Sequence, residues 1–202
     1  MASAITNQNS SYQISVGETS AQRENPNTIS WGKYILGFGL GLGMFLVYGP
    51  ITERIVKALG CSLDDPFNEM HIIEKIVLIP VVCILCPIGE EKLFRGSPYD
   101  LLKEKLQSYY SSLFSEGVAN VIARITTVFF SAVIFGLSHF MNALLSWRSP
   151  VLFLPQVIAA TIMGIIFALA KEISRGLEVP IGMHIGNNTL AWSAMMLSEF
   201  YV

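Results

Sequence analysis

The segment 87–96, with the sequence PIGEEKLFRG, holds two adjacent carboxylates close to an arginine. Glu91 and Arg95 are four positions apart, so on a helix they share one face and can form an ion pair. Neighbouring positions on a helix point about 100° apart, which places Glu90 on a face that the arginine does not share. A carboxylate partly removed from water suits a general base. The segment therefore predicts a structural role for Glu91 and leaves Glu90 free for chemistry, with a cluster of solvated charges as the alternative.

Two of the three histidines interrupt apolar runs. His139 alone would be read as a residue that links two helices by a hydrogen bond. His184 and Asn188 are four positions apart, so their side chains project from one helix face. Two neutral donors side by side can stabilise a developing oxyanion, although the same pair can also link helices. Asn187 points elsewhere and is the weaker candidate, and His71 stands at the edge of an apolar segment and is read as incidental.

These three motifs fall on three different predicted helices. Together they supply a base, a second imidazole and two oxyanion donors, which is the set of groups that a hydrolase needs. Water must reach such groups, so we expect them to line a cavity inside the helical assembly.

The composition indicates a membrane protein. Of 202 residues, 52% are hydrophobic and only 14% are charged, where soluble domains carry roughly 25% charged residues; the mean hydropathy is +0.52. Thirteen basic and 15 acidic residues give a net charge of −2, and no basic patch for nucleic acid is evident. Residues 1–30 are polar and predict a disordered tail without a cleavable signal peptide, followed by one domain over 31–202.

The chain predicts an all-α, polytopic bundle, because five stretches approach the roughly 20 apolar residues that cross a bilayer. They are residues 34–50, 72–91, 122–145, 151–170 and 180–196. Glycines at 37, 39, 41 and 43 predict close packing of the first helix against another. Residues 97–120 predict one amphipathic helix on the membrane surface, with a soluble connecting helix as the alternative.

The loops place nine Lys and Arg residues on one side of these five spans and four on the other. This bias predicts a cytoplasmic N-terminus and an outside C-terminus. It also creates a conflict, because Glu90 and His184 would both lie near the cytoplasmic surface while His139 lies some 15 residues into its helix, or about 22 Å. The three can meet only if the third helix begins well outside the bilayer or the second continues past Gly96.

The ordered set Glu90-Glu91-x-x-x-Arg95, Phe135-x-x-x-His139 and His184-x-x-x-Asn188 resembles the CPBP family, the CAAX-protease and bacteriocin-processing proteins also called Abi. The resemblance covers roughly residues 80–195. It implies a glutamic intramembrane protease that cleaves a membrane-associated protein or peptide without a cofactor. In that family Glu90 and His139 would activate water, His184 and Asn188 would stabilise the oxyanion, and Glu91 and Arg95 would support them. The small number of spans and the insert at 97–120 depart from the family pattern.

Two alternatives stay open. Family members have also been described as metalloproteases, and Glu90, His139 and His184 together offer the two histidines and a carboxylate of a common zinc site. The pair Cys83-x-x-Cys86 has no second pair to complete such a site. A non-catalytic membrane binding or immunity protein could keep the same fold, whereas the lack of an internal repeat argues against a transporter.

Overall fold

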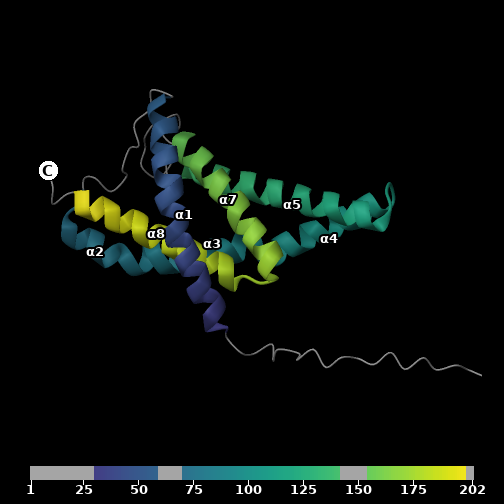
Figure 1. Ribbon diagram of the computed structural model, residues 1–202, viewed down its shortest axis with the longest axis horizontal. Coiled ribbons are helices and arrows are strands. Elements are labelled where there is room, and N and C mark those ends of the chain that lie inside the picture. Colours follow the sequence, from purple (N-terminus) through teal and green to yellow (C-terminus); the bar gives the residue numbers. More distant parts are fainter. Residues whose placement is uncertain (1–29, 59–69, 142–153, 199–202) are drawn as a thin grey trace, which may run out of the picture.

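The computed structural model describes residues 30–58, 70–141 and 154–198, and every regular element within these ranges is helical. The predicted all-α fold is thereby confirmed (Figure 1). The predicted tail over 1–30 lies outside the described residues, apart from Ser30. The stretch that joins the third and fourth predicted spans also lies outside them. In chain order the elements are α1 (Trp31–Ala58), α2 (Ile72–Pro80), the π-helical turn η1 (Val81–Leu85), α3 (Cys86–Arg95), α4 (Ser97–Ser111), α5 (Glu116–Ser138), α7 (Leu154–Ser174) and α8 (Glu178–Ser198).

Four segments of the described chain are long and apolar enough to cross a membrane. They are Trp31–Arg54, Ile72–Ser111, Glu116–Ser138 and Leu154–Ser174. The fifth predicted span, 180–196, forms a helix, α8, but this helix is not among the four. The polar residues His184, Asn187 and Asn188 lower the hydropathy of α8, and His184 and Asn187 are buried inside the protein. The predicted outside location of the C-terminus depended on five spans and stays a prediction.

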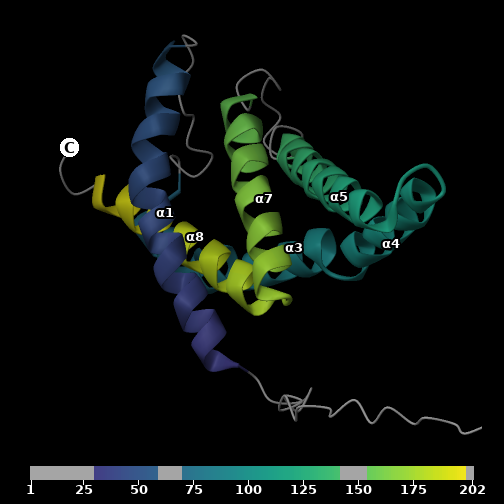
Figure 2. The same cartoon turned by 45° about the vertical axis from the view of Figure 1, so that its right-hand side comes forward.

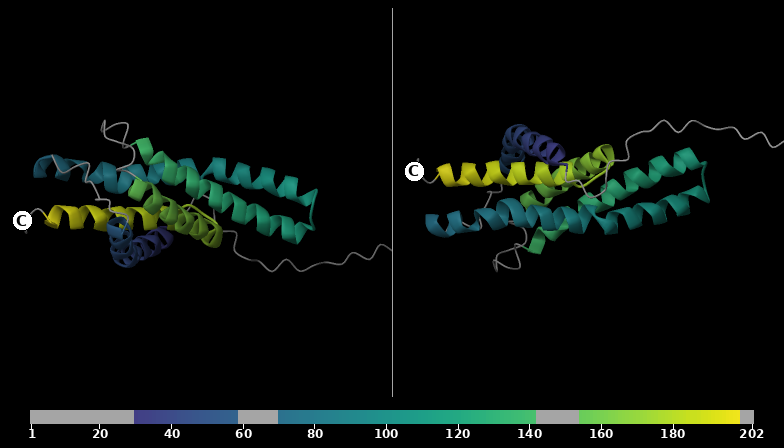
Figure 3. Two further views of the ribbon diagram at one scale, coloured as in Figure 1. Left: turned by 90° about the horizontal axis from the view of Figure 1, so that it is seen from above. Right: turned by 90° about the horizontal axis from the view of Figure 1, so that it is seen from below.

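The second predicted span is much longer than its sequence limits of 72–91. Helices α2, η1, α3 and α4 follow one another along one side of the molecule, and α8 runs beside the first three of them (Figure 3). At 1.5 Å per residue, the 40 residues of Ile72–Ser111 reach about 60 Å, which is about twice the hydrocarbon thickness of a bilayer. The helix is interrupted only at Gly96, where Ser97 and Pro98 begin α4.

Between α2 and α3 the backbone forms a π turn bounded by two prolines. The N–H of Cys86 bonds to the carbonyl of Val81, five residues earlier. In the same register the carbonyl of Val82 would accept from residue 87, but Pro87 has no N–H to donate. The Val82 carbonyl is therefore available to another donor, and such local π geometry often accompanies functional sites.

Helices α4 and α5 form an antiparallel hairpin (Figure 2). The expectation of one helix over 97–120 is therefore wrong in extent, because the chain turns at residues 112–115 and α5 begins at Glu116. Tyr110 and Thr126 face each other across the hairpin at 3.4 Å between their hydroxyl oxygens. The location of α4 on a membrane surface stays a prediction. The hairpin resolves the conflict over His139, since the second helix does continue past Gly96 and the third begins earlier than expected.

Helices α1 and α8 cross at backbone contact (Figure 1). A methyl group added at Gly37 or Gly41 would collide with the backbone of α8, and one added at Gly182 or Gly186 would collide with the backbone of α1. Gly39 and Gly43 face open space instead. The predicted close helix packing is confirmed for Gly37 and Gly41. The helix that packs against them is α8, which carries His184.

Gly41→Leu is expected to destabilise the protein by at least about 1–3 kcal/mol, because the new side chain must displace the backbone of Met183. The thermal unfolding midpoint of the detergent-solubilised protein measures this effect. Gly43→Leu is the matched control on the same helix, where an added Cβ meets nothing within 4 Å. Equal losses in the two variants would contradict the assigned contact.

Candidate active site

The centre of the candidate site is a buried carboxylate, Glu91, with two partners. Its Oε1 accepts a hydrogen bond from Nη1 of Arg95 at 2.9 Å and another from Nδ1 of His184 at 3.0 Å. Both members of the Glu91–Arg95 ion pair have fully buried side chains. Charges removed from water in this way need close partners. The predicted ion pair is confirmed, and the contact of Glu91 with His184 is an additional one.

Three further contacts hold Arg95 in place. Its Nη2 donates to the carbonyl of Gly164 on α7 at 3.2 Å. Its guanidinium carbon lies 4.1 Å from the centre of the Phe135 ring, a cation–π contact. Its own carbonyl accepts a hydrogen bond from Nζ of Lys171. Arg95 thus ties α3 to α5 and α7 around one buried carboxylate.

Glu90 lies on the other face of α3, as the helical spacing predicts. Its side chain is 36% exposed, while that of Glu91 is fully buried. Its Oε2 stands 3.6 Å from Nε2 of His184. The two adjacent glutamates therefore approach opposite nitrogens of one imidazole, and only Glu90 is reached by solvent.

The ring of His184 is held by two aromatic rings and by a hydrogen bond at one nitrogen. Phe167 stacks on it with ring centres 4.8 Å apart and 29° between the planes, and Phe135 meets it edge-on at 5.7 Å. Because the Oε1 of Glu91 also accepts from Arg95, it is the acceptor in its bond with His184 and Nδ1 carries the proton. Nε2 is therefore the nitrogen that faces Glu90.

His139 follows the last residue of α5 and approaches the same aromatic ring. Its Nδ1 lies 2.9 Å from the carbonyl of Phe135, and since a carbonyl can only accept, Nδ1 carries the proton and Nε2 has a free lone pair in the neutral ring. The Phe135 ring lies 5.0 Å from that of His139. The structure thus gathers all three motifs around Phe135.

Asn188 shares the face of His184, as predicted. Asn188 contacts η1 and His184 contacts α3, two consecutive segments of the same long helix. The Nδ2 of Asn188 donates to the carbonyl of Val82 at 3.1 Å, the carbonyl that Pro87 leaves available. Its Oδ1 accepts from Nδ2 of Asn187 at 3.3 Å. One amide hydrogen of Asn188 is therefore engaged by Val82. Asn187 thus contacts the Asn188 amide, and it also lines a separate cavity beside α1.

Sequence reasoning did not identify the two aromatic rings that hold His184. Phe135 was noted only as the first residue of the motif that contains His139. Phe167 lies within an apolar helix, and the sequence pattern does not distinguish it from its apolar neighbours. Both are fully buried. Ser131 was also missed, and it joins α5 to α3 by donating to the carbonyl of Phe94 at 3.0 Å.

Within the part of the chain that the structure describes, no three His, Cys, Asp or Glu side chains are grouped so that they could hold a metal ion. Glu90, His139 and His184 form no such group in this structure, and the expectation that the reaction needs no cofactor stays a prediction. Glu91 has its accepting Oε1 occupied by Arg95 and His184. We place no chemical step on a metal.

A family model described as type II CAAX prenyl endopeptidase Rce1-like matches residues 72–190, more than half of the chain. The chain belongs to this family. The match extends from the start of α2 into α8. It includes the six site residues that the sequence predicts, which are Glu90, Glu91, Arg95, His139, His184 and Asn188. It confirms the resemblance to the CAAX-protease family. Together with the four apolar helices, it identifies an integral membrane protein of the CAAX-protease type. No curated protein and no solved structure gives a significant match.

Proposed function

We propose that this protein is an intramembrane endopeptidase that hydrolyses a peptide bond of a membrane-associated protein or peptide. The observation that supports this most strongly is the position of His184 between a buried carboxylate and a solvent-exposed one. A purely structural ion pair needs only Glu91 and Arg95. The additional approach of Glu90 to Nε2 places an accessible base beside a fixed imidazole, which is the arrangement that acid–base chemistry requires.

Glu90 is the general base in this proposal. It removes a proton from a water molecule that His139 orients through the lone pair on Nε2. The hydroxide adds to the carbonyl carbon of the scissile bond and produces a tetrahedral oxyanion. Glu90 then returns its proton to the leaving amine, so that the C–N bond breaks and the carboxylate is restored.

His184 and Asn188 stabilise the oxyanion. When His184 is doubly protonated, Nδ1 donates to Glu91 and Nε2 donates to the oxyanion, so Glu91 sustains the positive charge. Asn188 offers its second amide hydrogen while Val82 holds the first. Arg95 holds Glu91 in position through the buried ion pair and does not touch the substrate.

The test is mass spectrometry of membrane-derived peptides from cells that express either the natural protein or Glu90→Gln. We expect new peptide termini with the natural protein that are absent with the variant. The same termini in both samples would contradict a protease role based on Glu90. A Glu90→Gln, His139→Ala protein that still performs its cellular role would indicate the non-catalytic binding or immunity function instead.

Removal of metal ions is expected to leave peptide cleavage unchanged, because in the proposed reaction Glu90 and His139 activate the water without a metal ion. The measurement compares cleavage rates before and after dialysis against a chelator, with bound metal determined by mass spectrometry. A loss of activity that zinc restores would support the metalloprotease alternative.

The membrane orientation follows from the distribution of Lys and Arg, which favours a cytoplasmic N-terminus. Membrane lipids and the peptide substrate are the partners that this proposal requires, and it involves no nucleic acid.

A further inference from the structure

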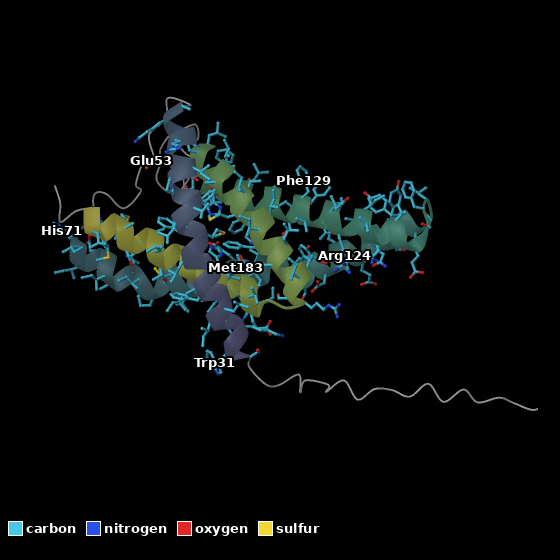
Figure 4. All side chains as sticks on the ribbon, viewed as in Figure 1. Trp31, Glu53, His71, Arg124, Phe129 and Met183 are labelled. Carbon is cyan, nitrogen blue, oxygen red and sulfur yellow. The ribbon has the colours of Figure 1, made fainter. Side chains whose placement is uncertain are left out.

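A cavity of 510 Å³ opens where α4, α5 and the C-terminal end of α7 meet. It is separate from the candidate active site, and Lys171 stands between the two, because its Nζ donates to the carbonyl of Arg95. Figure 4 labels Arg124 on α5 near the end of α7. Six charged side chains line the cavity: Asp100, Lys103, Arg124, Lys171, Glu172 and Arg175.

The cations in this cavity outnumber the carboxylates by four to two. Lys103 and Arg124 share Glu172, at 2.8 Å from Nζ of the lysine and 3.5 Å from Nε of the arginine. Lys171 takes the other carboxylate, Asp100, at 2.6 Å. Arg175 is exposed and has no ion-pair partner among the described residues. Two positive charges are therefore left without a matching carboxylate in the cavity.

The cavity lies at the end of a membrane span. The apolar segment of α7 ends at Ser174, and Arg175 follows it directly. Ile173, beside it, is 82% exposed, as expected for a side chain that meets lipid. Basic residues at this level face the headgroups of the bilayer. The positive cavity therefore opens where phosphate groups are concentrated.

We propose that this cavity binds a phosphate group, supplied by the headgroup of an anionic phospholipid. The guanidinium groups of Arg124 and Arg175 match the oxygens of a phosphate, which arginine binds in a bidentate manner. The positive excess favours an anion over a metal cation. A cavity of this size falls within the range of small-ligand sites. The site is independent of the proposed peptidase reaction.

Native mass spectrometry of the purified full-length protein tests this site. The probes are phosphatidylglycerol, phosphatidylcholine and inorganic phosphate, added separately. We expect phosphatidylglycerol to bind more tightly than phosphatidylcholine. Arg175→Gln is expected to weaken that binding about tenfold, the effect of losing one charge-assisted hydrogen bond.

The matched control is Arg54→Gln, which removes an exposed arginine at the end of another candidate span, outside the cavity. This variant is expected to bind phosphatidylglycerol as the natural protein does. Arg175→Gly guards against a folding defect, because Arg175 has a positive φ of 55° that glycine adopts without strain. It should lose the lipid and keep its thermal stability.

Binding of inorganic phosphate that depends on Arg175 and is as tight as lipid binding would support the phosphate site and identify a soluble source. Equal binding of phosphatidylglycerol to Arg175→Gln and to the natural protein would overturn the proposal. Equal weakening in Arg175→Gln and Arg54→Gln would also overturn it, because it would indicate general attraction of the lipid to surface charge.

Discussion

Glu90→Gln is expected to lower the rate of peptide-bond cleavage by about 10²–10⁴-fold, the contribution of a positioned general base. The substitution keeps the shape of the side chain and removes its ability to accept a proton. Because Glu90 is partly exposed and Glu91 makes the buried ion pair, the variant should fold normally. The measurement is the initial cleavage rate in proteoliposomes, with a peptide identified by the membrane mass-spectrometry experiment, alongside the thermal unfolding midpoint.

Glu104→Gln is the control for this prediction, since Glu104 is an exposed carboxylate on α4. It should cleave at the natural rate. A Glu90→Gln protein that cleaves at the natural rate would show that another group takes the proton from water. His184 would then be the leading candidate, since its Nε2 lies 3.6 Å from Oε2 of Glu90.

Arg95→Met is expected to destabilise the fold by about 3–5 kcal/mol, the usual result of removing one member of a buried ion pair. It leaves Glu91 buried with His184 as its remaining hydrogen-bond partner, and it removes the link to Gly164 on α7. Denaturant unfolding of the purified protein in detergent gives the free energy directly. Lys92→Met is the control on the same helix, because Lys92 is exposed.

The double variant Glu91→Gln, Arg95→Met separates the loss of a charge pair from the loss of packing. If the buried charge of Glu91 causes most of the destabilisation, the double variant is expected to be more stable than Arg95→Met alone. A double variant that is less stable by the sum of both single effects would contradict the coupling between these two residues.

The parts of the site that depend on local helix geometry could be predicted from the sequence. The Glu91–Arg95 pair, the separate face of Glu90 and the common face of His184 and Asn188 each follow from a spacing of one or four positions. The contact of the Gly37 and Gly41 series was also predictable as a type, because small residues permit close helix approach. Its partner helix was not.

The long-range contacts could not be predicted in this way. Glu91 and His184 are 93 positions apart, and no periodicity relates them. The ring of Phe167 is one apolar residue among many in α7, so only the tertiary structure distinguishes it. The limits of the helices were missed for another reason, because α3 and α4 run almost continuously through Gly96 and the polar start of α5 has no apolar signal. The three motifs, which must meet to form one site, predicted the arrangement of these helices better than the predicted helix limits did.

The contact of α1 with α8 restricts how a substrate can enter from the lipid. At Gly37, Gly41, Gly182 and Gly186 the backbones of the two helices approach each other directly, and Met44 of α1 packs beside Val179 and Met183 of α8. Separation of this seam would displace the helix that holds His184 and would break its bond with Glu91. We therefore expect α1 to stay fixed against α8 while a peptide enters, although α1 lies outside the family-matched residues 72–190.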